Sequence, residues 1–208
     1  MKKIIITVIF LYIFITGPVI AKTAEEGMPS LKFCGAKYTL YYSSKSPEIG
    51  GYINEYYKQR ESYASWTELI ALHHYPKAFY PIEHAKEFKM FLEKSNIPAY
   101  LEVDEKNNEA VLDFIVIDDR KLPIVMEFNV FKYVKSPVCG SVGFQYAKRY
   151  RVYNALEVDK FRKSFIKTRK KYVKKVLKHK VPELINSDVD YGKYVTKEAS
   201  SEEPKKEE

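Results

Sequence analysis

The sequence contains few of the residues that mark catalytic or metal sites. Its 208 residues include two cysteines, four histidines and one tryptophan. Neither cysteine belongs to a CxxC pair, so we expect no redox-active thiol. The sequence has no GxSxG, GxGxxG, P-loop, EF-hand or HExxH pattern. These absences remove the best-marked classes of hydrolase, nucleotide-binding protein and metalloprotein, and we predict no catalytic residue, metal or cofactor.

Two of the four histidines, His73 and His74, are adjacent in the segment SWTELIALHHYP. A metal site would need them together with His84 and a carboxylate such as Glu55 or Glu83. Neighbouring residues of a strand point to opposite faces of a sheet, so His73 and His74 cannot both bind one ion from a regular strand. We therefore interpret the pair as the solvated end of a strand that runs into a proline turn.

The acidic residues favour structural roles over catalysis. Asp118 and Asp119 lie in a charged segment that runs to a proline, which is typical of a solvated turn. Asp113 and Glu127 fall within predicted strands, where they can face each other across a sheet. An acid–base pair is one interpretation, but we favour polar-face residues that partner basic groups.

The first 21 residues predict export. Lys2 and Lys3 precede the apolar run IIITVIFLYIFI, and the small residues Val19 and Ala21 fit a cleavage site. The run is shorter than the roughly 20 residues of a membrane-spanning helix. We predict a signal peptide over residues 1–21, a mature chain that begins at Lys22, and a location in the periplasm or outside the cell. An uncleaved anchor helix is the alternative.

An oxidising compartment favours pairing of the two cysteines. A bridge between Cys34 and Cys139 would close a loop of about 100 residues and contribute up to about 4.7 kcal/mol on the chain-entropy model. We predict this disulfide, with two separate thiols as the alternative. The 18 tyrosines and 12 phenylalanines supply enough apolar area for the chain to fold without it.

Alternation of apolar and polar residues predicts an antiparallel sheet with one wetter face. Segment 81–98 has a helical period instead, with a proline in its first turn, and a second helix is expected over about 156–180. We predict an α+β domain, an antiparallel sheet of about six to seven strands packed by one mid-chain helix and a long C-terminal amphipathic helix. The segments with strand character are 36–42, 51–58, 66–75, 99–103, 109–117, 123–134 and 141–150.

The chain is expected to form a single domain over residues 36–185. Residues 22–35 are predicted to be an N-terminal extension. Residues 186–208 carry many charges and few apolar side chains, so this tail is predicted to be disordered.

Several motifs together resemble a family of uncharacterised bacterial exported proteins. They are INEYYKQRESYASWTELIALHHYP, DFIVID, MEFNVFKYVKSP, VGFQYAKRY and the closing Arg-containing helix, and the likeness covers most of residues 52–184. The resemblance implies export and this order of elements, but no active site. The order also resembles the Mog1/PsbP-like α/β sandwich, which is an analogy of fold alone.

The predicted C-terminal helix has a uniformly basic face. Residues 160–180 include eleven lysines and arginines and no acid. Phe161, Phe165, Tyr172, Val173 and Val176 form an apolar arc at helical spacing. This pattern favours an anionic envelope partner, such as a lipid headgroup, a polysaccharide or an acidic protein, over nucleic acid; the alternative is a solvated face. The predicted contact residues are Lys160, Lys163, Lys167, Lys170, Lys171, Lys174 and Lys178.

Two arginines, Arg162 and Arg169, fall at the centre of the apolar arc. A buried unpaired charge is costly, so each must extend to solvent or meet a carboxylate. An arginine can bind a carboxylate through two hydrogen bonds. We predict that Arg169 packs on the sheet as a structural ion pair with Glu127 or Asp113.

Three classes of function fit these observations. We favour an exported, non-catalytic domain that binds or assembles with an anionic envelope component through the basic helix. The alternatives are an enzyme whose active site has no recognisable motif, and a carrier of a lipid or small apolar ligand.

Overall fold

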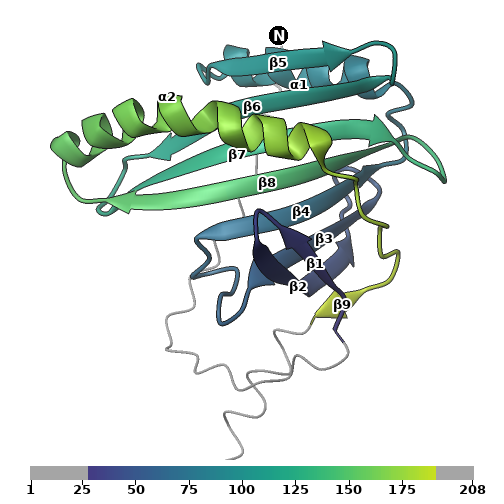
Figure 1. The fold of residues 1–208 in the computed structure, drawn as a ribbon. Helices are drawn as coiled ribbons and strands as arrows, with labels where there is room; N and C mark the ends of the chain where they lie inside the picture. The colour runs from purple at the N-terminus through teal and green to yellow at the C-terminus, as the bar shows by residue number, and fades with distance from the viewer. Residues whose placement is uncertain (1–27, 191–208) are drawn as a thin grey trace, which may run out of the picture.

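The computed structural model describes residues 28–190, and these residues build one antiparallel sheet with two helices (Figure 1). The predicted signal peptide and most of the predicted tail lie outside the described residues. The strands follow the order β1-β2-β3-β4-β8-β7-β6-β5, and β9 pairs with β2. The elements are β1 (Ser30–Phe33), β2 (Ala36–Lys45), β3 (Tyr52–Lys58), β4 (Glu68–Tyr75), α1 (Pro81–Lys94), β5 (Ala99–Asp104), β6 (Glu109–Asp118), β7 (Ile124–Lys135), β8 (Ser141–Val152), α2 (Ala155–Lys178) and β9 (Val189–Asp190).

The predicted fold is wrong in the size of the sheet, which has nine strands within residues 28–190 instead of six or seven. The additional strands are β1, within the predicted N-terminal extension, and β9, within the predicted tail. They pair with successive parts of β2 and share its outer edge. Strands of four and two residues are too short to show a period of two in the sequence, so the pattern that revealed the other seven could not reveal these. Segment 66–75 contains a strand, β4, as predicted.

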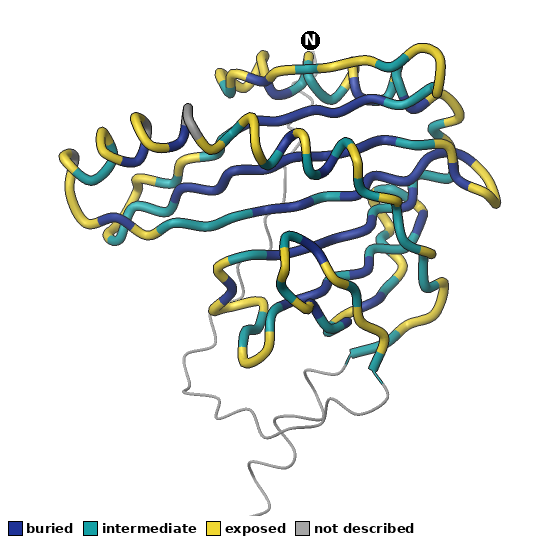
Figure 2. The backbone as a smooth tube through the Cα atoms, in the orientation of Figure 1, coloured by how far each residue is buried: buried dark blue, intermediate teal, exposed yellow. Residues whose placement is uncertain are grey.

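Both faces of the central strands are buried, because α2 covers one face of the sheet and α1 covers part of the other (Figures 1 and 2). On β7, Phe128 and Val130 face the α2 side, and Phe131 and Tyr133 face the α1 side. Burial on both faces replaces the strict alternation that a half-wet strand shows, so eight consecutive residues of β7 are buried. The sheet thus has a solid interior under α2.

Two glycines allow other segments to close over the end of β4. A Cβ atom on Gly51 would lie 2.0 Å from the carbonyl oxygen of His74, and one on Gly140 would lie 2.0 Å from the carbonyl oxygen of Tyr75. Gly140 also has a φ of 68°, which glycine adopts readily. The close approach of both backbones covers the strand end that the sequence predicts to be solvated.

Candidate functional site

The basic helix α2 begins at a reciprocal cap. The Asn154 side chain accepts a hydrogen bond from the Glu157 backbone N–H at 3.0 Å, and the Glu157 carboxylate accepts one from the Tyr153 backbone N–H at 2.8 Å. These bonds satisfy amide groups that the first turn of a helix leaves unpaired. The start of α2 is therefore fixed where the chain leaves β8.

The inner face of α2 is the apolar arc that the sequence predicts. Phe161, Phe165, Val173 and Val176 are buried in the core under the helix. The rings of Phe165 and Phe128 meet edge to face, with centroids 4.5 Å apart. This contact holds α2 against β7 and turns its opposite face to solvent.

The structure places Arg169 against Asp113, one of the two acids named from the sequence. The guanidinium donates from Nε and Nη2 to the two carboxylate oxygens at 2.5 and 2.7 Å, and it stacks 4.2 Å from the ring centroid of Tyr100. The Asp113 side chain is 3% exposed and the Arg169 side chain 23%. Glu127 points to the opposite face of the sheet and pairs with Arg149 at 2.7 Å. The structure does not describe the side chain of Arg162.

A buried cation, Lys132, binds the end of α2. Lys132 on β7 donates from Nζ to the carbonyl oxygens of Leu177 and His179, at 3.0 and 3.3 Å. Its Nζ also lies 3.0 Å from the carboxylate of Glu109. A cation at this position offsets the partial negative charge of a helix C-terminus. Burial and the neighbouring Lys132 lower the pKa of His179.

A carboxylate on β4 organises the polar groups beside α2. Glu68 accepts a hydrogen bond from the Tyr38 hydroxyl at 2.8 Å and pairs with Lys58 and Lys148 at 2.9 and 3.1 Å. Burial raises the pKa of Glu68, but the hydrogen bonds from these three side chains outweigh that effect and lower the pKa to about 2. Lys148 also donates to the Tyr172 hydroxyl at 3.2 Å, which links the network to α2.

The outer face of α2 presents an exposed row of lysines, which we call the lysine stripe. All of its members were predicted as contact residues from the sequence. The structure does not describe the side chain of the one remaining predicted residue, Lys167. The stripe consists of Lys160, Lys163, Lys170, Lys171, Lys174 and Lys178.

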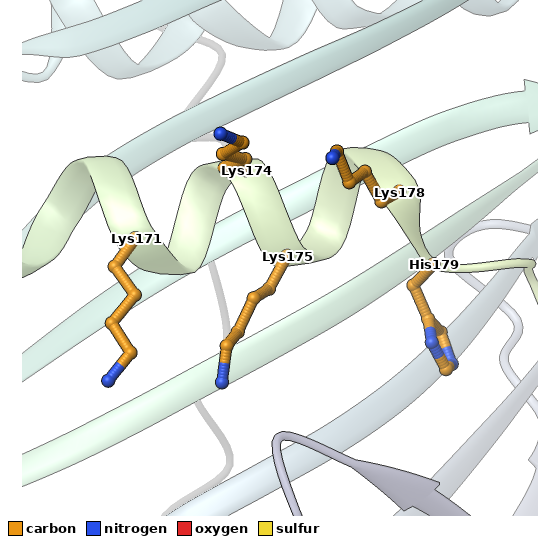
Figure 3. A pocket seen from close by; sticks show the side chains of 5 residues that line it. All are labelled: Lys171, Lys174, Lys175, Lys178 and His179. Atoms are coloured by element: carbon orange, nitrogen blue, oxygen red, sulfur yellow. The ribbon is translucent and has the colours of Figure 1, made fainter.

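The second half of α2 borders an open hollow of about 490 Å³, which we call the basic hollow (Figure 3). Lys175 and His179 line it with three residues of the stripe, and no acid contributes to its lining. The sequence interpretation missed Lys175 and His179, because it selected the lysines farthest from the apolar arc. Lys171, Lys175 and His179 recur every four residues, which places them on one flank of a helix, and this spacing would have revealed them. The lining residues are Lys171, Lys174, Lys175, Lys178 and His179.

The two cysteines are free thiols, so the predicted disulfide is absent from the structure. Cys34 follows β1 beside Lys175, and burial raises the pKa of its thiol. Cys139 is exposed before β8, and its Sγ lies 3.9 Å from Nε2 of His74. The two thiols thus have different neighbours, and the sequence spacing alone contains no information about that geometry.

The paired histidines are structural, but they are not the wet strand end that the sequence predicts. Nε2 of His74 bonds the carbonyl oxygen of Cys139 at 2.9 Å, and the residue is 8% exposed. Nε2 of His73 bonds Oε1 of Gln145 at 2.7 Å on the other face. Within residues 28–190 no three His, Cys, Asp or Glu side chains are grouped as metal ligands.

A polar row crosses the sheet on the face opposite α2. The Gln145 amide, bound to His73, donates to Oδ1 of Asn129 at 2.7 Å. Burial raises the pKa of the nearby Glu55, and a hydrogen bond from the Tyr57 hydroxyl at 2.6 Å opposes that shift. Burial also lowers the pKa of His73. These bonds account for the polar groups of the row without a ligand.

Within the described part of the chain, no helix combines the length and the apolar character needed to cross a membrane.

The comparisons with known proteins define a family. A family model matches residues 27–181, which covers most of the chain and every element from β1 to α2. The chain therefore belongs to that family, a bacterial family of uncharacterised proteins. Searches of curated proteins and of solved structures find no match.

Proposed function

We propose that the chain is an exported, non-catalytic domain that binds an anionic component of the cell envelope through the outer face of α2. The observation that carries this proposal is the basic hollow, which is lined by four lysines and one histidine and by no acid. Such a surface attracts phosphate or carboxylate groups on a lipid, a polysaccharide or a protein. The N-terminal sequence supplies the support for export.

The rigid inner face of α2 supports a role in recognition. The Arg169–Asp113 pair and the bonds from Lys132 fix the rotation of the helix on the sheet. The lysines therefore project from a fixed position, and binding requires no ordering of the backbone. A disordered lysine-rich segment would lack this advantage.

Retention on immobilised dextran sulfate tests the proposal. The wild-type protein should be retained and should elute in a salt gradient, since screening weakens exposed charge interactions. A variant with glutamine at four positions of the hollow should elute at much lower salt. Its substitutions are Lys171→Gln, Lys174→Gln, Lys175→Gln and Lys178→Gln.

A matched control separates position from net charge. It carries the same number of Lys→Gln changes at exposed lysines outside α2, and it should elute like the wild type. Equal loss of retention in both variants would mean that binding follows net charge alone, and the proposed surface would be wrong. The control positions are Lys77, Lys86, Lys94 and Lys106.

A further inference from the structure

Three large apolar side chains are exposed together at one end of the sheet. Leu122, Tyr153 and Leu156 are 67%, 63% and 72% exposed. Ile124 at the start of β7 pairs with Val152 at the end of β8, so Leu122 and Tyr153 leave the sheet at the same end. Leu156 follows in the first turn of α2 (Figure 1). We call these three residues the apolar tip.

Leu156 of the apolar tip and the lysine stripe share one surface of α2. At about 100° per residue, every residue of the stripe lies within about 60° of Leu156 around the helix axis. Asp159, the one exposed acid of α2, is followed directly by Lys160. The outward face of α2 therefore begins with the exposed Leu156 and continues as lysines, and Leu122 and Tyr153 are exposed at the same end of the sheet.

We propose that the anionic partner is a lipid bilayer surface, on which α2 lies flat with the apolar tip inserted among the acyl chains. This inference rests on the proposed function and deepens it. Exposed apolar groups next to a basic helix face are the features that place a helix in a membrane interface. A polysaccharide offers the lysines the same anionic groups but offers the tip no apolar phase.

The length of α2 indicates that the helix lies parallel to the membrane surface. Leu156 and Lys174 are about 27 Å apart along the helix axis. An upright helix with its tip inserted would hold Lys174 far beyond the screening length of about 8 Å at physiological salt. Only a helix parallel to the surface brings both the tip and the far end of the lysine stripe to the headgroups.

Cosedimentation with vesicles tests this inference. The probes are vesicles of phosphatidylcholine alone and vesicles that mix it equally with phosphatidylglycerol. The exported protein, as the cell processes it, should bind the mixed vesicles and not the neutral ones. The combined substitutions Leu122→Ser, Tyr153→Ser and Leu156→Ser should weaken vesicle binding by about tenfold or more. The same variant should elute from dextran sulfate like the wild type.

A matched control changes three equally exposed apolar residues elsewhere, Phe79→Ser, Tyr80→Ser and Val138→Ser, and it should bind vesicles like the wild type. Val138 follows the far end of β7, about 40 Å from the tip along the strand. Undiminished vesicle binding by the tip variant would overturn the inference and leave the proposed function intact. If the wild-type protein is not retained on dextran sulfate, the proposed function itself is refuted.

A fluorescent reporter makes the test independent of the folding of the tip variant. The substitution Leu156→Trp places an indole at the tip, while the native Trp66 is 5% exposed in the interior. On mixed vesicles, brominated lipid should quench the emission of the new indole. Vesicle-bound protein whose new indole escapes quenching would exclude insertion of the tip.

Discussion

The pair between Arg169 and Asp113 can be tested by removing its partners one at a time. Arg169→Met keeps the length of the side chain but leaves a carboxylate that is 3% exposed without its cation. Breaking a buried pair in this way typically costs about 3–5 kcal/mol. Because the Arg169 side chain is 23% exposed, we expect a loss near the lower limit, about 3 kcal/mol in the free energy of unfolding.

Removal of the acid instead of the arginine should lower the free energy of unfolding by less. Asp113→Val leaves an arginine that can extend past Tyr100, which is 57% exposed, and reach solvent. We expect a loss of about 1 kcal/mol, the size of one ordinary hydrogen bond. The double variant Arg169→Met/Asp113→Val has neither charge. Its free energy of unfolding should lie within about 1 kcal/mol of the wild-type value, since an apolar pair can replace a buried ion pair.

Urea unfolding followed by fluorescence of Trp66 provides the assay, because this single tryptophan is buried against Tyr57 and Leu69. With a slope of about 2 kcal/mol per molar urea, Arg169→Met should lower the midpoint by about 1.5 M. An unchanged midpoint in Arg169→Met would refute the argument. So would a double variant that is no more stable than Arg169→Met alone.

Two further predictions follow from the acid network and from the N-terminal sequence. Glu68 has a pKa lowered from 4.5 to about 2, so its contribution to stability should be complete above about pH 4.5 and lost as the pH falls toward 2. Glu68→Gln should lower stability at pH 7 by about 2 kcal/mol after a discount for solvent, and the variant should change less than the wild type over that acid range in urea titrations. Protein extracted from the cell envelope should yield an N-terminal sequence that starts at Lys22, and recovery of Met1 from membranes would contradict the predicted cleavage.

Arg169, a charged residue within the apolar arc of the C-terminal helix, was the most informative residue in the sequence. Arg169 interrupts an apolar arc, so helix geometry left two outcomes, extension to solvent or an ion pair, and we predicted the ion pair. The choice between Asp113 and Glu127 required the sheet register. Asp113 lies opposite Val130, which faces α2, whereas Glu127 and its partner Arg149 face away. Strand alternation restricts each residue to one face, but the sequence does not say which face the helix covers.

Long-range contacts account for what the sequence did not predict. His74 looked solvated beside a proline, yet the backbones at Gly51 and Gly140 close over its strand. The burial of His74 thus depends on segments distant in sequence, which periodicity cannot report. Lys175 and His179 were missed for a different reason, because their spacing of four residues was visible in the sequence and was not used.

The inner contacts of α2 determine what its outer face can bind. A helix with this density of like charge repels itself, so its folded state depends on contacts that the sheet provides. The cap at Asn154, the pair at Arg169 and the bonds from Lys132 hold its start, middle and end. Rotation by one residue, about 100°, would move the lysine stripe toward the sheet and the aromatic arc toward solvent. The contacts of Arg169 and Lys132 therefore set the rotation of α2, and that rotation brings Leu156 and the lysines onto one surface.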